Sequence, residues 1–214
     1  MGASPMRTRI KVCGMTDAGE VAGAVAAGVD AVGFIFAAKS PRSVTPETAR
    51  AIIEGLPPFV DAVGVFVNTP IAQVNDIARH CRLTLVQLHG DESPDDCALA
   101  CVRAVKAFRV GADAPGPDFT PYAGRVAGIL LDTYVPHQAG GTGLAFDWGL
   151  VGQFDLPAPL ILAGGLTPDN VVAAIQTVRP YAVDVNSGVE ISPGRKDLDR
   201  LRRFIRLVRS HDPV

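Results

Sequence analysis

The sequence lacks several features that would place a protein outside the ordinary globular class. It has no run of about 18 apolar residues, so no segment reads as a membrane span. The segment Met1–Met6 has no apolar stretch of the kind that defines a signal peptide. Basic and acidic residues nearly cancel, 20 against 22, and leave no excess of positive charge for nucleic acid. We therefore predict a cytoplasmic protein with no membrane or nucleic-acid partner.

Cysteine is also scarce, with four residues in 214 and no Cys-x-x-Cys spacing. This excludes a disulfide scaffold and favours a reducing compartment. Cys97 and Cys101 lie four apart in a segment that reads as helical, so we expect both on one face as small buried residues. Hydrophobic residues make up 48% and charged residues 20%, which is enough apolar material for one sizeable core.

Short apolar runs recur along the whole chain, each separated by the length of one helix and two loops. Most are continuous rather than alternating, as expected when helices cover a parallel sheet. The eight runs are Ile10–Val12, Ala31–Phe36, Ala62–Val67, Leu85–Leu88, Val105–Val110, Gly128–Asp132, Leu160–Ala163 and Ala182–Val185.

Helix signals lie between these runs. A hydroxyl residue followed by proline, at Thr45, Thr69, Ser93 and Thr167, predicts four helix starts. The start at Ser93 precedes a helix predicted over Cys97–Val102. Further helices are predicted over Asp17–Ala27, where Gly28 is a suitable stop, and over Leu198–Val208. The crossover Gly111–Tyr122 is rich in proline and glycine, so the fifth helix should be short or distorted.

Eight strand–helix units in 214 residues predict an α/β protein with a single-domain (β/α)₈ fold, the TIM barrel, over residues 9–214. Residues 1–8 are predicted to be a flexible tail. In such barrels the reacting groups stand at the carboxyl ends of the strands. The residues that follow each strand therefore carry the functional prediction.

Four polar residues follow the early strands. Cys13 ends the first strand, where a catalytic thiol and a buried structural thiol are about equally favoured. Arg42 follows the second strand and can hold a carboxylate or phosphate, or simply be a solvated loop residue. Gln87 and His89 alternate onto one side of the fourth strand and are candidate ligand contacts. No second histidine has metal-binding spacing, so no metal is expected.

The later strands offer an acid and two glycine turns. Asp132 follows three apolar residues, and apolar surroundings raise the pKa of a carboxyl and suit it to proton donation. The alternative is that Asp132 caps the following loop. Gly164-Gly165 and Ser187-Gly188 follow strands seven and eight, the usual phosphate site of these barrels. A small phosphorylated metabolite is the predicted ligand.

Taken together, these strings resemble the phosphoribosylanthranilate isomerase family of tryptophan biosynthesis. The resemblance runs from the first strand to the last. It is carried by Lys11-Val12-Cys13-Gly14-Met15-Thr16, Ser40-Pro41-Arg42, Gly64-Val65-Phe66-Val67-Asn68, Val86-Gln87-Leu88-His89-Gly90-Asp91-Glu92, Leu131-Asp132, Gly140-Gly141-Thr142-Gly143 with Phe146-Asp147-Trp148, Leu162-Ala163-Gly164-Gly165-Leu166, and Asp184-Val185-Asn186-Ser187-Gly188-Val189-Glu190.

The resemblance implies an Amadori rearrangement of N-(5-phosphoribosyl)anthranilate without cofactor or metal. In this scheme Asp132 is the general acid and must be held partly protonated. Cys13, as a thiolate, is the general base, a role that suits neutral pH if its pKa is somewhat lowered; the sequence does not give that pKa. Arg42 would hold the anthranilate carboxylate. The remaining implied substrate contacts are Gln87, His89, Gly143, Gly164, Gly165, Asp184, Ser187 and Gly188. Asp184 would orient the sugar or the base, and it is assigned no chemical step.

One position departs from the resemblance, since Asn186 stands where a second small hydroxyl residue is expected. Rival hypotheses are the histidine-pathway isomerase, indole-glycerol-phosphate synthase, and an enzyme serving both aminoaldoses. A non-catalytic phosphometabolite-binding barrel is a further alternative, and a thiol redox protein is disfavoured because Cys13 has no resolving cysteine nearby. The sequence leaves a monomer and a homodimer equally open.

Overall fold

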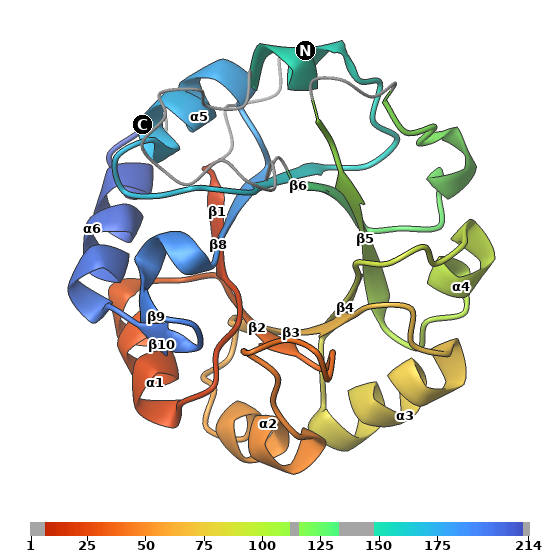
Figure 1. Ribbon diagram of the computed structural model, residues 1–214, viewed down its shortest axis with the longest axis horizontal. Coiled ribbons are helices and arrows are strands. Elements are labelled where there is room, and N and C mark those ends of the chain that lie inside the picture. The colour runs from red at the N-terminus through yellow and green to blue at the C-terminus, as the bar shows by residue number, and fades with distance from the viewer. Residues whose placement is uncertain (1–6, 112–115, 133–147, 212–214) are drawn as a thin grey trace.

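The computed structural model describes residues 7–111, 116–132 and 148–211. Eight parallel strands close into a barrel in sequence order, with the last strand pairing with the first (Figure 1). The predicted (β/α)₈ fold is therefore confirmed. The strands are β1 Arg9–Val12, β2 Ala31–Ile35, β3 Asp61–Phe66, β4 Leu85–Leu88, β5 Arg103–Arg109, β6 Gly128–Asp132, β7 Leu160–Ala163 and β8 Ala182–Val185.

Helices form an outer ring around the barrel (Figure 1). The α-helices are α1 Ala18–Ala27, α2 Pro46–Ile53, α3 Ile71–Cys81, α4 Pro94–Ala98, α5 Val171–Val178 and α6 Leu198–Arg209. The short 3₁₀ helices are η1 Thr120–Tyr122, η2 Trp148–Gln153 and η3 Ser187–Val189. A hairpin of β9 Glu190–Ser192 and β10 Arg195–Lys196 follows β8. In the described ranges, no helix is both long and apolar enough to span a membrane.

The predicted helix starts are partly confirmed. Thr45 accepts a hydrogen bond from the backbone of Thr48, and Ser93 forms a reciprocal capping box with Asp96. These bonds satisfy amide groups that the first helical turn cannot pair. By contrast, α3 begins after Pro70 with no side-chain cap.

The fourth crossover contains a shorter α-helix than predicted, and the fifth contains no α-helix in its described residues. The predicted helix to Val102 is wrong, because α4 ends at Ala98. Asn75 of α3 hydrogen-bonds to the backbone that follows α4: its amide donates to Leu99 O, and its oxygen accepts from the Cys101 amide. Cys97 is buried and Cys101 exposed, so they share no helix face. In the fifth crossover, the described residues form only the 3₁₀ turn η1, as the proline-rich sequence predicted.

The end of the predicted tail is attached to the barrel. Thr8 is buried and its carbonyl accepts a hydrogen bond from Arg209 of α6, while Arg7 donates to Asp30. The flexible tail predicted over 1–8 is thus wrong for these last two residues. Residues 1–6 lie outside the described residues.

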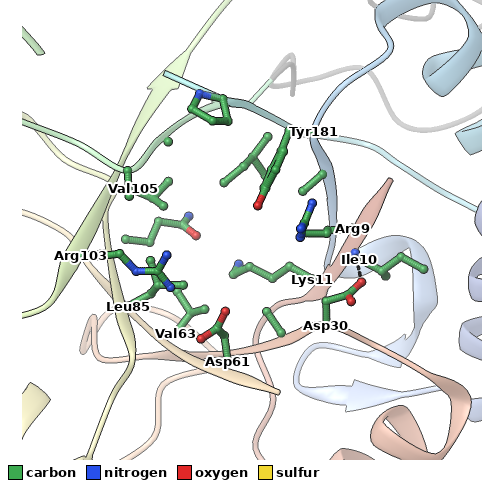
Figure 2. A pocket seen from close by; sticks show the side chains of 17 residues that line it. Arg9, Ile10, Lys11, Asp30, Asp61, Val63, Leu85, Arg103, Val105 and Tyr181 are labelled. Carbon is green, nitrogen blue, oxygen red and sulfur yellow. Dashed lines mark hydrogen bonds between the residues drawn. The ribbon is translucent and has the colours of Figure 1, made fainter. Parts of the chain in front are cut away.

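The buried apolar side chains form a larger and a smaller cluster, and the smaller one contains Val105, Ala107, Leu130 and Ala163. The larger apolar core lies between the barrel and the helices, and its fully buried members include Phe34, Phe66 and Phe204. A cavity of about 140 Å³ lies at the amino ends of the strands (Figure 2). There the Arg9 guanidinium stacks 4.3 Å from the centre of the Tyr181 ring. Residues at this end of such barrels generally contribute to stability, so the active site is expected at the opposite end.

Candidate active site

A cavity of about 480 Å³ opens at the carboxyl ends of the strands. It gathers nearly every residue that the sequence singled out, from the ends of six of the eight strands. Its polar and glycine lining comprises Cys13, Arg42, Gln87, His89, Asp132, Gly164, Gly165, Asp184, Asn186, Ser187 and Gly188. Gly143 lies outside the described residues. Residues remote in sequence therefore face one space large enough for a small phosphorylated ligand.

Cys13 lies directly after β1, and its amide donates to Val185 O of β8 at 2.9 Å. The residue is buried, with 5% of its surface exposed. Room for its side chain depends on Gly33 in the neighbouring strand β2. A methyl group at Gly33 would stand 3.0 Å from Cys13 Sγ, which is tighter than ordinary packing allows. The thiol position is thus set by two strands of the barrel.

Burial raises the pKa of the Cys13 thiol, whereas a base that acts at neutral pH needs a somewhat lowered pKa. The cause is desolvation, which disfavours the thiolate. The Lys11 ammonium opposes it through its charge and a hydrogen bond, whereas the charge of Asp184 acts in the same direction as burial. Ionisation of this thiol therefore depends on its charged neighbours.

Lys11 and Asp184 form a buried ion pair beside Cys13. Lys11 Nζ lies 2.7 Å from Asp184 Oδ2, and both side chains are more than nine-tenths buried. Burial raises the pKa of Asp184, and Lys11 only partly offsets it. Burial acts to lower the pKa of Lys11, but Asp184 and Cys13 outweigh this and raise it. Lys11 was not predicted as a site residue, although its alternation with Cys13 along β1 was a usable signal.

Asp132 lies next to His89 in the cavity. His89 Nε2 lies 3.4 Å from Asp132 Oδ2, and His89 Nδ1 lies 3.0 Å from Gln87 Nε2. Because the Gln87 amide nitrogen can only donate, Nδ1 accepts and Nε2 of a neutral imidazole carries the proton toward Asp132. The two candidate ligand contacts therefore form a chain that orients the candidate acid.

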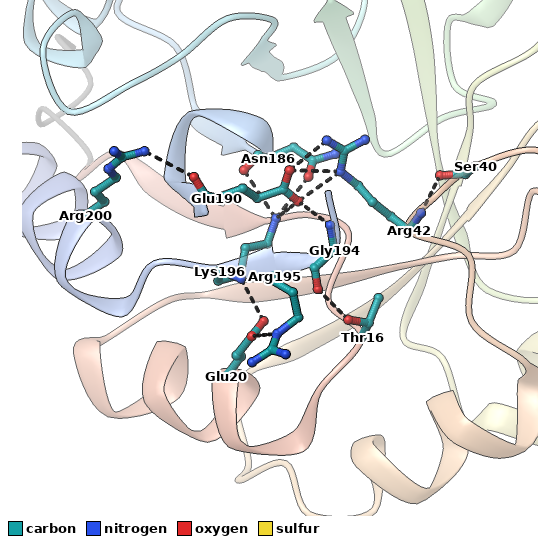
Figure 3. Close-up of polar contacts among 10 residues, drawn as sticks. All are labelled: Thr16, Glu20, Ser40, Arg42, Asn186, Glu190, Gly194, Arg195, Lys196 and Arg200. Carbon is teal, nitrogen blue, oxygen red and sulfur yellow. Dashed lines mark hydrogen bonds and ion pairs between the residues drawn. The ribbon is translucent and has the colours of Figure 1, made fainter. Parts of the chain in front are cut away.

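Arg42 is held in place by Glu190 of the β9–β10 hairpin (Figure 3). Its Nε and Nη2 lie 2.9 Å and 2.7 Å from the two carboxylate oxygens. The hydrogen bonds to Glu190 raise the pKa of Arg42. The Lys196 ammonium, fully buried, contacts Glu190 at 2.9 Å and the side chain of Asn186 at 3.0 Å.

This charged network was missed in the sequence, because Glu190 and Lys196 follow the last barrel strand rather than end it. It also gives Asn186 a role. The Asn186 amide oxygen accepts from Lys196, a contact that ties the turn after β8 to the hairpin. The unexpected asparagine is thus part of the scaffold under Arg42.

The two glycine turns lie side by side because β7 and β8 are neighbours in the barrel. Gly164 and Gly165 both have positive φ, 92° and 62°, which ordinary side chains rarely adopt. Gly188 lies so close to the first turn that an added Cβ would be 1.9 Å from Leu166 O. The backbone of both turns can therefore approach a ligand closely.

A further cavity of about 540 Å³ adjoins the first and shares His89 with it. Its inner wall contains Lys106, whose Nζ contacts Glu92 at 3.0 Å and donates to Gly90 O at 2.6 Å. Both side chains are almost fully buried. In the described parts of the chain, no group of three histidine, cysteine or acidic residues gathers as a metal site.

The fold and the cavity define a class of protein: a (β/α)₈ barrel whose acid and base candidates face a cavity lined by two glycine turns. Comparison with known proteins specifies the family. A model of the N-(5′-phosphoribosyl)anthranilate (PRA) isomerase family matches residues 10–207, and the chain belongs to that family. This membership supports the predicted family over the histidine-pathway isomerase and the synthase.

Relatives with the same name are similar along nearly their whole length. The N-(5′-phosphoribosyl)anthranilate isomerase of Geobacter sulfurreducens is 56% identical over 198 residues, which cover 92% of this chain and 97% of the relative. That of Pseudomonas aeruginosa strain LESB58 is 51% identical over 205 residues, covering 94% and 95%.

Solved structures agree with the sequence relatives. The isomerase from Thermotoga maritima is 41% identical, with a TM-score of 0.81 and coverage of 95% of this chain and 99% of that one. A phosphoribosyl anthranilate isomerase in complex with reduced 1-(o-carboxyphenylamino)-1-deoxyribulose 5-phosphate is 39% identical, with a TM-score of 0.80 and the same coverage.

Proposed function

We propose that this chain converts N-(5′-phosphoribosyl)anthranilate into 1-(2-carboxyphenylamino)-1-deoxyribulose 5-phosphate by general acid–base catalysis. The observation that carries the proposal is one cavity that contains both Cys13 and Asp132 together with the two glycine turns, in a chain of this family. A relative bound to a reduced form of that product supports the same substrate class.

In the proposed first step, Asp132 gives its proton to the ring oxygen of the substrate. The bond from C1′ to the ring oxygen breaks, the anthranilate nitrogen supplies the electron pair for a Schiff base, and Asp132 is left as a carboxylate. His89, oriented by Gln87, is then a hydrogen-bond donor to that carboxylate. The hydrogen bond stabilises the carboxylate that remains after Asp132 has given up its proton, and it therefore supports Asp132 as the proton donor.

In the second step, the Cys13 thiolate removes the proton from C2′. The electron pair of the C–H bond moves to form an enolamine, which tautomerises to the ketone. Cys13 lines the same cavity as Asp132 but comes from a different strand, β1 rather than β6, with β7 and β8 between them. Two groups from separate strands suit a reaction whose proton is donated at one atom and removed at another.

The remaining substrate contacts are proposed from the charge and shape of the residues that line the cavity. Arg42, fixed by Glu190, is proposed to hold the anthranilate carboxylate. Gly164, Gly165, Ser187 and Gly188 are proposed to bind the phosphate. Gly143 stays a prediction. We further propose that the enzyme acts in the cytoplasm as a monomer or homodimer; one solved relative is described as monomers of the dimeric isomerase from Thermotoga maritima.

The test follows the loss of substrate fluorescence with purified protein. Acid–base groups of this kind contribute about 10²- to 10⁴-fold, so Cys13→Ala and Asp132→Asn should each lower kcat by that factor. Cys101→Ala, at an exposed thiol, is the matched control and should retain wild-type turnover. Full activity in both site variants would refute the assignment of roles. An inactive but folded wild type would refute the activity itself, and the histidine-pathway aminoaldose would be assayed next.

A further inference from the structure

Lys11 is a buried charged residue to which the proposed mechanism gives no task. It lies two residues before Cys13, so both side chains point to the inside of the barrel. Figure 2 shows the Lys11 side chain within the barrel. Only 6% of the residue is exposed, and its Nζ lies 2.7 Å from Asp184 Oδ2 on the adjacent strand β8. A buried ammonium is costly to keep, which makes its position informative.

Asp184 uses only one of its two oxygens in this pair. Oδ2 accepts from Lys11, whereas Oδ1 is buried and has no hydrogen-bond partner among the described residues. Asp184 lines the same cavity as Cys13 and Asp132. A buried carboxylate oxygen without a donor is unfavourable, so a hydroxyl donor in the cavity would be bound there. The sugar part of a phosphoribosyl substrate carries such hydroxyls.

We propose that the Lys11 ammonium is a counter-ion shared by Asp184 and Cys13. In the resting enzyme it pairs with Asp184, and Cys13 is a thiol. When a sugar hydroxyl of the substrate donates to Asp184 Oδ1, Asp184 holds the ammonium less strongly and Lys11 stabilises the Cys13 thiolate. The thiol proton passes to solvent, and no other bond changes. Lys11 is thus a positioning residue for the base, an inference that rests on the proposed isomerase function.

Several charged groups face Cys13, and their contributions differ. Lys11 from β1 and Lys196 from β10 favour the thiolate, and Asp184 from β8 opposes it. Arg42, in the loop after β2, also interacts with the thiol. Among these, the charge of Lys11 has the largest effect, followed by that of Asp184. The Lys11–Asp184 pair as a whole therefore favours the thiolate.

The experiment measures the alkylation rate of Cys13 by iodoacetamide as a function of pH, with the Cys13 peptide resolved by mass spectrometry from the other three thiols. A charge within about 4–6 Å shifts a pKa by about one unit or more. Lys11→Met should raise the pH midpoint by about one unit or more and slow alkylation at neutral pH about tenfold. Asp184→Asn should lower the midpoint and speed alkylation.

Opposite directions are the diagnostic result, because a general loss of packing would move both variants the same way. The double variant Lys11→Met/Asp184→Asn removes both charges and leaves no buried ion unpaired. If Lys11→Met does not fold, the double variant still tests the proposal. The pH midpoint of its Cys13 alkylation should lie above that of wild type and below that of Lys11→Met. Lys106→Met breaks a second buried lysine–carboxylate pair and should leave the Cys13 midpoint unchanged.

The steady-state constants kcat and KM provide a separate measurement. Lys11→Met should lower kcat with little change in KM, and raising the pH should restore part of the loss. Equal midpoints in wild type, Lys11→Met and Asp184→Asn, or shifts in one direction, would overturn the shared counter-ion even if the isomerase is active. If the midpoints shift as expected while substrate is not turned over, the charge sharing stands and the proposed function fails.

Discussion

Replacing Glu190 with glutamine removes one negative charge from beneath Arg42 and changes the side-chain shape little. Glu190 accepts from Arg42 and from Lys196, and also from the Gly194 amide at 3.2 Å. The Lys196 side chain is fully buried and Glu190 is 4% exposed at its side chain. The substitution therefore leaves a buried ammonium without its anion.

The magnitude follows from that burial. Removing one partner of a buried ion pair costs about 3–5 kcal/mol, and a glutamine that keeps one acceptor oxygen belongs at the lower end, about 3 kcal/mol. For a chain of this size, such a loss lowers Tm by about 6–12 °C. Because Arg42 loses its anchor, KM for the substrate should rise more than kcat falls.

The pH dependence of the folding stability tests independently whether the Glu190 carboxylate is stabilising. Burial acts to raise the pKa of Glu190, but Arg42 and Lys196 outweigh it and hold the pKa below the ordinary value of 4.5. A carboxyl with a lowered folded-state pKa stabilises the protein fully above its unfolded-state pKa and loses this effect as pH falls through the folded value. The stability difference between wild type and Glu190→Gln should therefore shrink below about pH 4.5.

Urea unfolding at pH 7 and pH 3.5 measures both effects. Glu54→Gln is the control, because the Arg50–Glu54 pair is exposed at 41% and 47% and should contribute less than about 1 kcal/mol. If Glu190→Gln unfolds at the same urea concentration as wild type, the network of Figure 3 does not stabilise the fold as argued.

Two further predictions concern the glycine turn and the core. Gly188→Ala places a Cβ 1.9 Å from Leu166 O, so the turn must move and KM should rise at least about tenfold. Gly55→Ala is the control and should not change KM, because the nearest atom to its added Cβ is 3.5 Å away. Equal KM values for the two variants would contradict a rigid phosphate site. Phe204→Ala, at a fully buried position of α6, should lower the free energy of unfolding by about 3–5 kcal/mol. Phe59→Ala, at a fully exposed position, should change it by less than about 0.5 kcal/mol. Denaturant curves for both variants test this, and a similar loss in each would refute the burial argument.

The sequence alone determined the barrel and the strand ends. Buried strands such as Gly128–Asp132 show as continuous apolar runs, because both faces of a parallel sheet are covered. The regular spacing of eight such runs then leaves few folds open. Since strand ends meet at one rim, the sequence alone predicts that Cys13 and Asp132 face the same space.

Only the tertiary structure decided the charges around the base and the end of α4. Lys11 and Asp184 are 173 residues apart, and Arg42 and Glu190 are 148 apart, so no local pattern pairs them. The sequence left the pKa of Cys13 open for the same reason: burial is a property of the packed barrel, and it raises this pKa. The helix α4 ends early because Asn75, from another helix, binds Leu99 O and the Cys101 amide. Periodicity records which residues are buried, whereas the partners of each buried charge depend on which strands and loops become neighbours.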